Sequence, residues 1–192
     1  MISTIRGDVT NIGDNSIILE VGGVGLKIYV PLLLLKKVDL GDIVRLQTEL
    51  VVREDSLTLY GFESKEEKDF FILFLGVNGV GPRTAMAAIS TLSIDLIKRA
   101  VISEQPELFN RIPGVGKKGA QKIFLHLQGR VGDVSPLPDD KAFDVDMEIL
   151  EALTGLGYSV VEAQAAIQAI PRDAPKELEE RLRAALSYFS KY

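Results

Sequence analysis

Apolar and polar residues alternate through the first third of the chain. Between Ile43 and Arg53, the apolar residues Val44, Leu46, Leu50 and Val52 fall on one face of an extended chain, and mostly charged or amide side chains fall on the other. A period of two is typical of a β-strand with one buried face. We therefore expect this stretch to form a strand that packs its apolar face against a core.

Further strands are predicted on either side of it. The runs Ser16–Val21 and Gly25–Val30 flank Gly22-Gly23, which is the signal of a tight β-hairpin, and Ser56–Phe62 has a similar strand composition. About five or six short antiparallel strands in roughly sixty residues suit a small barrel, and the OB-fold is the commonest such barrel among nucleic-acid binders. We expect an OB-fold barrel over residues 1–63.

The apolar period then changes to that of a helix. Ser64-Lys-Glu-Glu67 is a capping box that opens a helix, Ser93 begins a connecting helix, and Pro106 opens the next. This pattern predicts an all-α domain over residues 64–130. The residues expected to form its shared core are Leu73, Leu75, Ile89, Leu96, Leu108, Ile123 and Leu127.

One pattern occurs twice in this helical segment. Val77–Ala85 and Ile112–Ala120, thirty-five residues apart, both read h-x-G-h-G-x-x-x-A, where h is apolar. This is the helix-hairpin-helix pattern, in which two glycines allow a tight turn between helices. The amides that begin the second helix lack partners within it and lie at the positive end of its dipole. An anion can bind there, and in this motif the anion is a nucleic-acid phosphate.

Cations accompany both copies of the pattern. Two ordinary αα-hairpins would explain the glycines, but they would not explain a basic residue beside each turn. Val80 and Val115, which lie between the glycines, are expected to plug each turn into the core. The predicted phosphate-binding residues are Asn78, Gly79, Val80, Gly81, Arg83, Gly114, Val115, Gly116, Lys117, Lys118 and Lys122.

The charge distribution supports this prediction. The 192-residue chain has a net charge of −5, which by itself argues against a nucleic-acid partner. Residues 1–62 carry −2 and residues 131–192 carry −6, whereas residues 63–130, which hold both hairpins, carry +3. No acidic residue occurs between Leu108 and Gly132. A local basic patch is what phosphate contact requires.

The remainder of the chain reads as a tether and a small helical unit. Gly129–Ala142 breaks every period with prolines, glycines and aspartates, which predicts a flexible acidic linker over residues 131–142. Residues 143–192 are expected to form a three-helix domain. Its predicted helices are Asp144–Thr154, Ser159–Ile170 and Lys176–Phe189.

This order of parts resembles the RuvA family of Holliday junction branch migration subunits. The most specific stretches are Leu50–Phe62, Asn78–Pro82, Ile112–Lys118 and Leu153–Tyr158, and the resemblance covers essentially the whole chain. It implies an OB-fold barrel, a tandem helix-hairpin-helix domain and a tail like the three-helix ubiquitin-associated (UBA) domains. It also implies a homotetramer, or a face-to-face octamer, that holds a four-way DNA junction open.

The resemblance assigns roles to further residues. Glu54 and Asp55 match an acidic pin near the crossover of the junction, although a plain polar hairpin tip is the alternative. The tail is implied to recruit the hexameric ATPase RuvB, and the junction resolvase RuvC is a further candidate partner. The expected docking residues, which could instead only fill the small core of the tail, are Leu156, Tyr158, Leu182 and Leu186. Gly119 departs from the family pattern, which usually has a helix-favouring or hydroxyl residue there.

An enzyme is the first alternative class. The base-excision glycosylases also use helix-hairpin-helix motifs, but they need a catalytic aspartate after the hairpin, and Asp95 reads better as part of a helix start. Gly114–Lys118 lacks the longer glycine loop of a nucleotide-binding P-loop. The chain has no cysteine, and its only histidine, His126, has no second ligand beside it. We expect no catalytic residue, no metal site and no cofactor in this chain alone.

A less specific single-strand or duplex DNA-binding accessory protein is the second alternative, because small barrels bind single strands through exposed aromatic side chains. The barrel segment is net negative and its aromatic residues are Tyr29, Tyr60 and Phe62, so it is poorly equipped for this role. The N-terminus lacks the layout of a signal peptide, and no apolar run could span a membrane. We expect a cytoplasmic protein with no membrane partner.

Overall fold

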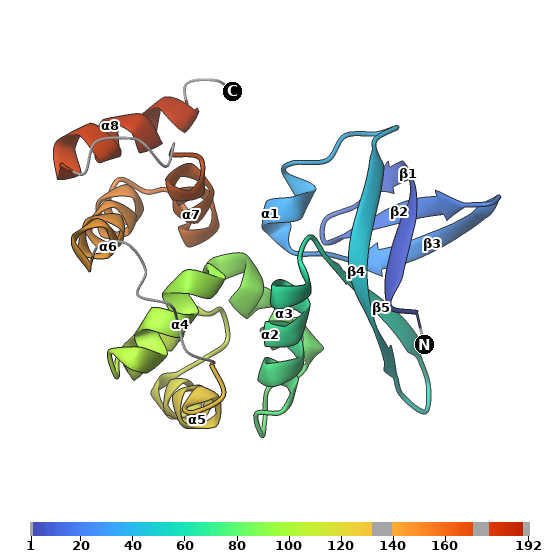
Figure 1. The fold of residues 1–192 in the computed structure, drawn as a ribbon, viewed down its shortest axis with the longest axis horizontal. Coiled ribbons are helices and arrows are strands. Elements are labelled where there is room, and N and C mark those ends of the chain that lie inside the picture. The colour runs from blue at the N-terminus through green and yellow to red at the C-terminus, as the bar shows by residue number, and fades with distance from the viewer. Residues whose placement is uncertain (1, 132–139, 171–176, 190–192) are drawn as a thin grey trace. The chain divides into compact units, whose positions relative to one another are not determined.

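The computed structural model describes residues 2–131, 140–170 and 177–189 (Figure 1). The chain divides into two compact units, Met1–Gln128 and Gly129–Tyr192. None of the described helices combines the length and the apolar character needed to cross a membrane.

The first part of the N-terminal unit is a closed barrel. Its elements are β1 (Thr4–Ile12), β2 (Ser16–Val21), β3 (Val24–Tyr29), the short helix α1 (Leu32–Leu35), β4 (Ile43–Val52) and β5 (Leu57–Phe62). The strands close in the order β1–β2–β3–β5–β4. All neighbours pair antiparallel except β3 and β5, which are parallel. The predicted OB-like barrel is confirmed, with five strands, but the expectation that all of its strands are antiparallel is wrong for the β3–β5 pair.

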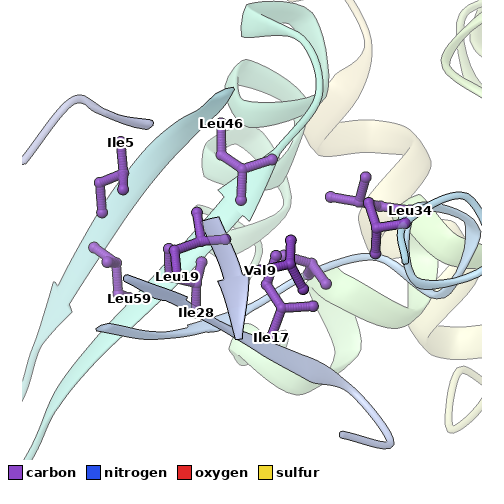
Figure 2. Packing of buried hydrophobic residues seen from close by; sticks show 10 residues of the cluster. Ile5, Val9, Ile17, Leu19, Ile28, Leu34, Leu46 and Leu59 are labelled. Carbon is purple, nitrogen blue, oxygen red and sulfur yellow. The ribbon is translucent and has the colours of Figure 1, made fainter. Parts of the chain in front are cut away.

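Aliphatic side chains from every strand fill the barrel (Figure 2). The predicted hairpin at Gly22-Gly23 is confirmed, with φ of +59° and +83°, the pair of positive values that a type I′ turn needs. The sequence does not identify β1, because Gly7 interrupts its inward row between Ile5 and Val9 and weakens the apolar alternation. The labelled core residues are Ile5, Val9, Ile17, Leu19, Ile28, Leu34, Leu46 and Leu59.

The prediction that Val52 lies on a buried face is wrong. Val52 shares a face with the buried residue Leu46, but it is 63% exposed. β4 and β5 pair as far as Val52 and Leu57, whereas β3 pairs with β5 only near Leu59 and Tyr60. The β4–β5 hairpin therefore extends past the barrel. Its last residue pair, Val52 and Leu57, has no barrel strand facing it.

Helices form the rest of this unit. They are α2 (Lys65–Leu75), α3 (Pro82–Thr91), α4 (Ile94–Ile102), the 3-10 helix η1 (Pro106–Arg111) and α5 (Lys117–Leu127). The predicted capping box at the start of α2 is confirmed by the reciprocal bonds of Ser64 and Glu67. Ser93 caps α4 through the Leu96 amide, as its position predicts.

The core of the helical segment contains more aromatic side chains than the sequence predicts. The predicted core residues on α3, α4, η1 and α5 are buried, but Leu73 and Leu75 are only half-buried. Phe70, Phe71 and Phe74 occupy the buried face of α2 instead. The larger rings remove more apolar area from water, so they decide which face of α2 turns inward.

The barrel and the helices pack through one of these rings. The centroid of the Phe71 ring lies 4.9 Å from that of Tyr60 and 5.0 Å from that of Phe62, both on β5. In addition, the Leu32 amide donates to the Ser90 hydroxyl at 3.0 Å, which joins α1 to α3. These contacts hold the hairpins against the barrel.

The C-terminal unit contains α6 (Asp140–Gly155), α7 (Val160–Gln168) and α8 (Leu178–Phe189). Three helices are confirmed, but α6 begins before Asp144, the predicted start. Most of the expected linker, residues 132–139, lies outside the described residues. The capping box of Ser159 with Glu162 is confirmed, and Arg181 pairs with Asp146 at 2.6 Å.

Candidate nucleic-acid interface

The two hairpin turns have the same backbone conformation. Gly79 has φ of +91° and Gly114 has φ of +84°, a region that L-residues with a side chain rarely adopt. The second glycines also match, with φ/ψ of −93°/175° at Gly81 and −90°/177° at Gly116. The sequence repeat is therefore a structural repeat.

The hydrogen bonds repeat as well. The Val80 amide donates to the Val77 carbonyl at 3.0 Å, and the Val115 amide donates to the Ile112 carbonyl at 3.0 Å. Each bond closes a tight turn that leads directly into a helix. Val80 and Val115 are half-buried, so they cover the turns without being enclosed by the core.

Both turns end at a helix start that no side chain caps. Gly81 is the N-cap residue of α3 and Gly116 is that of α5, and neither helix has a side-chain cap. Pro82 at the first position of α3 has no amide hydrogen, so α5 offers one more donor than α3 does. The backbone donors at these ends carry partial positive charge, which suits an anion.

The second glycine of each turn leaves room for a close approach. A Cβ atom built on Gly81 or Gly116 meets nothing within 4 Å. Their φ values accept any residue, so the internal structure of the chain does not require glycine at either position. Without a side chain there, a molecule outside the chain can reach the helix-start amides.

Three cations lie in the first turns of α3 and α5, and a fourth lies one turn further along α5. Arg83, Lys117, Lys118 and Lys122 are all exposed. None of them is paired with a carboxylate in the part of the chain that the structure describes. Lys118 and Lys122 lie one turn apart on α5, so their charges share one helix face. The sequence-predicted phosphate-binding residues thus come together at two uncapped, basic turns.

A local contact accounts for the glycine at position 119. A Cβ atom at this position would lie 3.2 Å from Cγ1 of Val115, which is closer than most such contacts. Glycine therefore leaves space for Val115 to fold over the first turn of α5. The helix begins at Lys117 despite the low helix propensity of glycine.

Glu54 and Asp55 form the tip of the β4–β5 hairpin. Both are exposed, and the Arg53 amide closes the turn by donating to the Ser56 carbonyl at 2.9 Å. The Ser56 hydroxyl donates to Asp55 Oδ1 at 3.2 Å. In Figure 1, this tip and the loop between α2 and α3 both point toward the lower edge of the view. The acidic tip and the first basic turn therefore project from the same side of the N-terminal unit.

The aromatic side chains of the barrel take part in packing. Phe62 is fully buried, and the Tyr60 ring packs against Phe71. Burial raises the pKa of Tyr60, while Arg53 opposes that shift. Tyr29 lies 5.8 Å from Tyr60 between ring centroids, with the Lys27 ammonium group 5.3 Å from the Tyr29 ring. These rings leave little free aromatic surface for stacking bases.

The four candidate docking residues of the tail differ in exposure. Tyr158 stacks on Phe189, with 4.0 Å between ring centroids, and Leu182 and Leu186 pack against the same core. Leu156 is 64% exposed and precedes Gly157, whose φ is +99°. The loop thus presents one apolar side chain outward, while the other three support the small core.

No group of three or more metal-ligating side chains occurs among the described residues. Paired helix-hairpin-helix turns beside a small barrel define a DNA-binding protein of the helix-hairpin-helix class. Family comparisons match the RuvA N terminal domain over residues 1–61, a SAM-like helix-hairpin-helix tandem over 71–128 and the RuvA C-terminal domain over 145–190. The chain belongs to the RuvA family.

Relatives match along nearly their whole length. A protein of Chloroflexus aurantiacus is 44% identical over 192 residues, and one of Herpetosiphon aurantiacus is 41% identical over 194 residues, with 98% of both chains covered in each case. A protein of Thermobifida fusca is 36% identical over 201 residues, with 100% of both chains covered. All three are named Holliday junction branch migration complex subunit RuvA. The resemblance expected from the sequence is confirmed.

Proposed function

We propose that this chain is the DNA-binding subunit of a branch migration complex and that it holds a four-way DNA junction in recombination and repair. The observation that carries the proposal is the repeated turn: two hairpins with one backbone conformation, each without a side-chain cap and each beside at least one exposed cation. Two such turns can grip the phosphates of one duplex on both sides of its minor groove.

Contacts of this kind position DNA without reading its sequence. The proposed donors are the amides at the starts of α3 and α5, and Arg83, Lys117, Lys118 and Lys122 add charge. Phosphate contacts carry no base information, so the binding energy is the same at every position along the duplex. The salt dependence of such binding follows from counterion release. A grip without sequence preference allows the duplex arms to slide, as branch migration requires.

Preference for a junction over a duplex then has to come from symmetry. We propose a homotetramer, with a face-to-face octamer as the alternative. Four identical subunits around one axis provide one duplex-binding site for each arm of the junction. In that arrangement Glu54 and Asp55 would act as the acidic pin at the centre. Their charges would repel phosphates, help to part the strands and disfavour a continuous duplex across the centre.

The remaining parts of the chain have proposed roles as well. Residues 1–63 would serve as the barrel and residues 64–130 as the DNA-binding domain. Residues 143–192 would dock the motor RuvB, with Leu156 as the most accessible contact and Tyr158, Leu182 and Leu186 supporting it. RuvC is a further proposed partner. The chain itself would contribute no catalytic step and would act in the cytoplasm.

A direct comparison of DNA shapes tests this function. The full chain would be titrated at one fixed salt concentration against an immobile four-way junction, a duplex and a single strand of matched length. We expect the junction to bind most tightly and the mass of the free protein in solution to be that of four chains or eight. A monomeric protein, or equal affinity for duplex and junction, would refute the proposal.

A further inference from the structure

The acidic tip rests on an exposed apolar pair. Val52 and Leu57 are directly opposite each other in the β4–β5 ladder, immediately below the four-residue turn. Val52 is 63% exposed and Leu57 is 72% exposed. Opposed residues in an antiparallel pair point to the same face of the hairpin, so these two side chains form one apolar surface.

This surface continues the barrel core beyond the barrel. Along β4, Leu46 is buried and Leu50 half-buried before Val52 emerges, and along β5 Leu59 is buried before Leu57 emerges. No described side chain covers the outermost pair, since both residues remain more than half exposed. Exposure of apolar area to water is unfavourable. A molecule that covers the apolar face at this strand end would therefore be stabilised by the burial of that area.

The charges beside this pair restrict what can cover it. Glu54 and Asp55 stand directly above it and repel phosphate, so the sugar-phosphate backbone is a poor occupant. A nucleobase face is uncharged, flat and apolar, so it suits both the surface and its acidic border. Apolar side chains of DNA-bending proteins make this kind of contact when they wedge between base steps and partly unstack them.

We propose that Val52 and Leu57 contact the faces of bases at the crossover of a bound junction and hold them unstacked. The inference rests on the proposed function, since it needs the hairpin tip to stand at the centre of a junction. The carboxylates would keep the backbones apart while the apolar pair shelters the bases that have lost a stacking neighbour. Every base has an apolar face, so this contact is also independent of sequence.

The test uses the full chain and an immobile junction with 2-aminopurine at the crossover, whose fluorescence rises when the base unstacks. The variant V52T/L57T keeps β-forming residues on the exposed strand and removes the apolar contact. At saturating protein we expect it to lose at least about half of the fluorescence rise seen with the unaltered chain. Its affinity for the junction should change by less than about threefold, because the hairpin amides hold the phosphates.

Val21 and Val24 supply a matched control. Like Val52 and Leu57, they are opposed and exposed apolar residues beside a hairpin turn, here at Gly22-Gly23. The variant V21T/V24T should leave the fluorescence unchanged. A second variant, L57F, enlarges the apolar surface and should raise the signal above that of the unaltered chain, which keeps the inference testable if the threonine variant folds poorly.

The outcomes separate the wedge from the junction-binding proposal. Unchanged fluorescence in V52T/L57T, with junction preference intact, overturns the wedge alone. A fall in the solution mass of V52T/L57T also overturns it, because the pair would then lie between copies of the chain. Failure of the unaltered chain to prefer the junction would overturn the proposed function and the wedge together.

Discussion

At the scale of single residues, the four hairpin glycines serve two different purposes. Gly79 and Gly114 adopt positive φ, so the turn itself requires them. Gly81 and Gly116 have ordinary backbone angles and open space around a built Cβ. Only an external molecule approaching the helix start gains from the missing side chain at the second pair.

This difference predicts a split between stability and binding. The variant G81A/G116A should keep the melting temperature of the unaltered chain and lose roughly tenfold in DNA affinity for each phosphate hydrogen bond that a Cβ displaces. G79A should instead lower stability by about 1–2 kcal/mol, because alanine is strained at positive φ. Thermal melts and duplex titrations measure the two effects. Equal destabilisation by both variants would show that all four glycines are structural.

The acidic tip allows a second prediction at this scale. The variant E54Q/D55N removes two exposed charges but keeps the shape of the turn, so the fold should be unaffected. Duplex binding should tighten severalfold at low salt, and the preference for the junction should fall, because repulsion of phosphates at the centre is lost. Binding to both DNA shapes at two salt concentrations measures this. Unchanged selectivity would make Glu54 and Asp55 a plain polar hairpin tip.

At the scale of elements, α2 joins the barrel to the first of the two glycine turns. Its capping box places the Glu67 carboxylate against the amides of Glu63 and Ser64, at 3.0 and 3.4 Å. Burial raises the pKa of Glu67, and those amide bonds only partly offset the shift. The folded state therefore favours the protonated carboxyl more than the unfolded chain does. The stabilisation from this protonated form is present at acid pH and is lost as the pH rises through the Glu67 pKa.

The variant E67Q should reveal this effect. Glutamine also completes a capping box but is never charged, so E67Q should be at least as stable as the unaltered chain at neutral pH. The difference should shrink as the pH falls, and melts between about pH 4 and pH 7 would measure it. D69N, which neutralises an exposed carboxylate on the same helix, is the control. A difference that grows toward acid pH would contradict the assignment.

At the scale of the whole molecule, the chain has two compact units, Met1–Gln128 and Gly129–Tyr192. The first holds both basic turns and the acidic tip, and the second holds the exposed Leu156. Each unit has its own apolar core. The proposed DNA-binding site and the proposed docking site for the motor therefore lie in different units.

Deleting residues 143–192 should therefore leave junction affinity within about twofold of the full chain, because no proposed phosphate contact is lost. Branch migration driven by the partner ATPase should stop. L156S is a sharper variant, since it removes the exposed docking side chain and should spare the fold, whereas L178S on α8 serves as the control. A truncated chain that still supports branch migration would refute the docking role.

Much of the fold and of the candidate site follows from local patterns. The glycine turns, the capping boxes at Ser64 and Ser159 and the β2–β3 hairpin depend on neighbouring residues, so the sequence predicts each of them. Prediction from the sequence fails where burial depends on residues that are distant in the chain. The phenylalanines of α2 displace Leu73 and Leu75 from the core, and Val52 loses its expected burial, because both outcomes depend on which elements lie opposite.

The sequence by itself determined the repeated turns, the local excess of cations and the family, because these depend on residue types at fixed spacing. Tertiary structure alone decided that both turns share one backbone geometry, that Gly81 and Gly116 face open space and that Val52 and Leu57 overhang the barrel. Exposure is a property of the folded surroundings. A strand's own residues cannot specify where the opposite wall of a barrel ends.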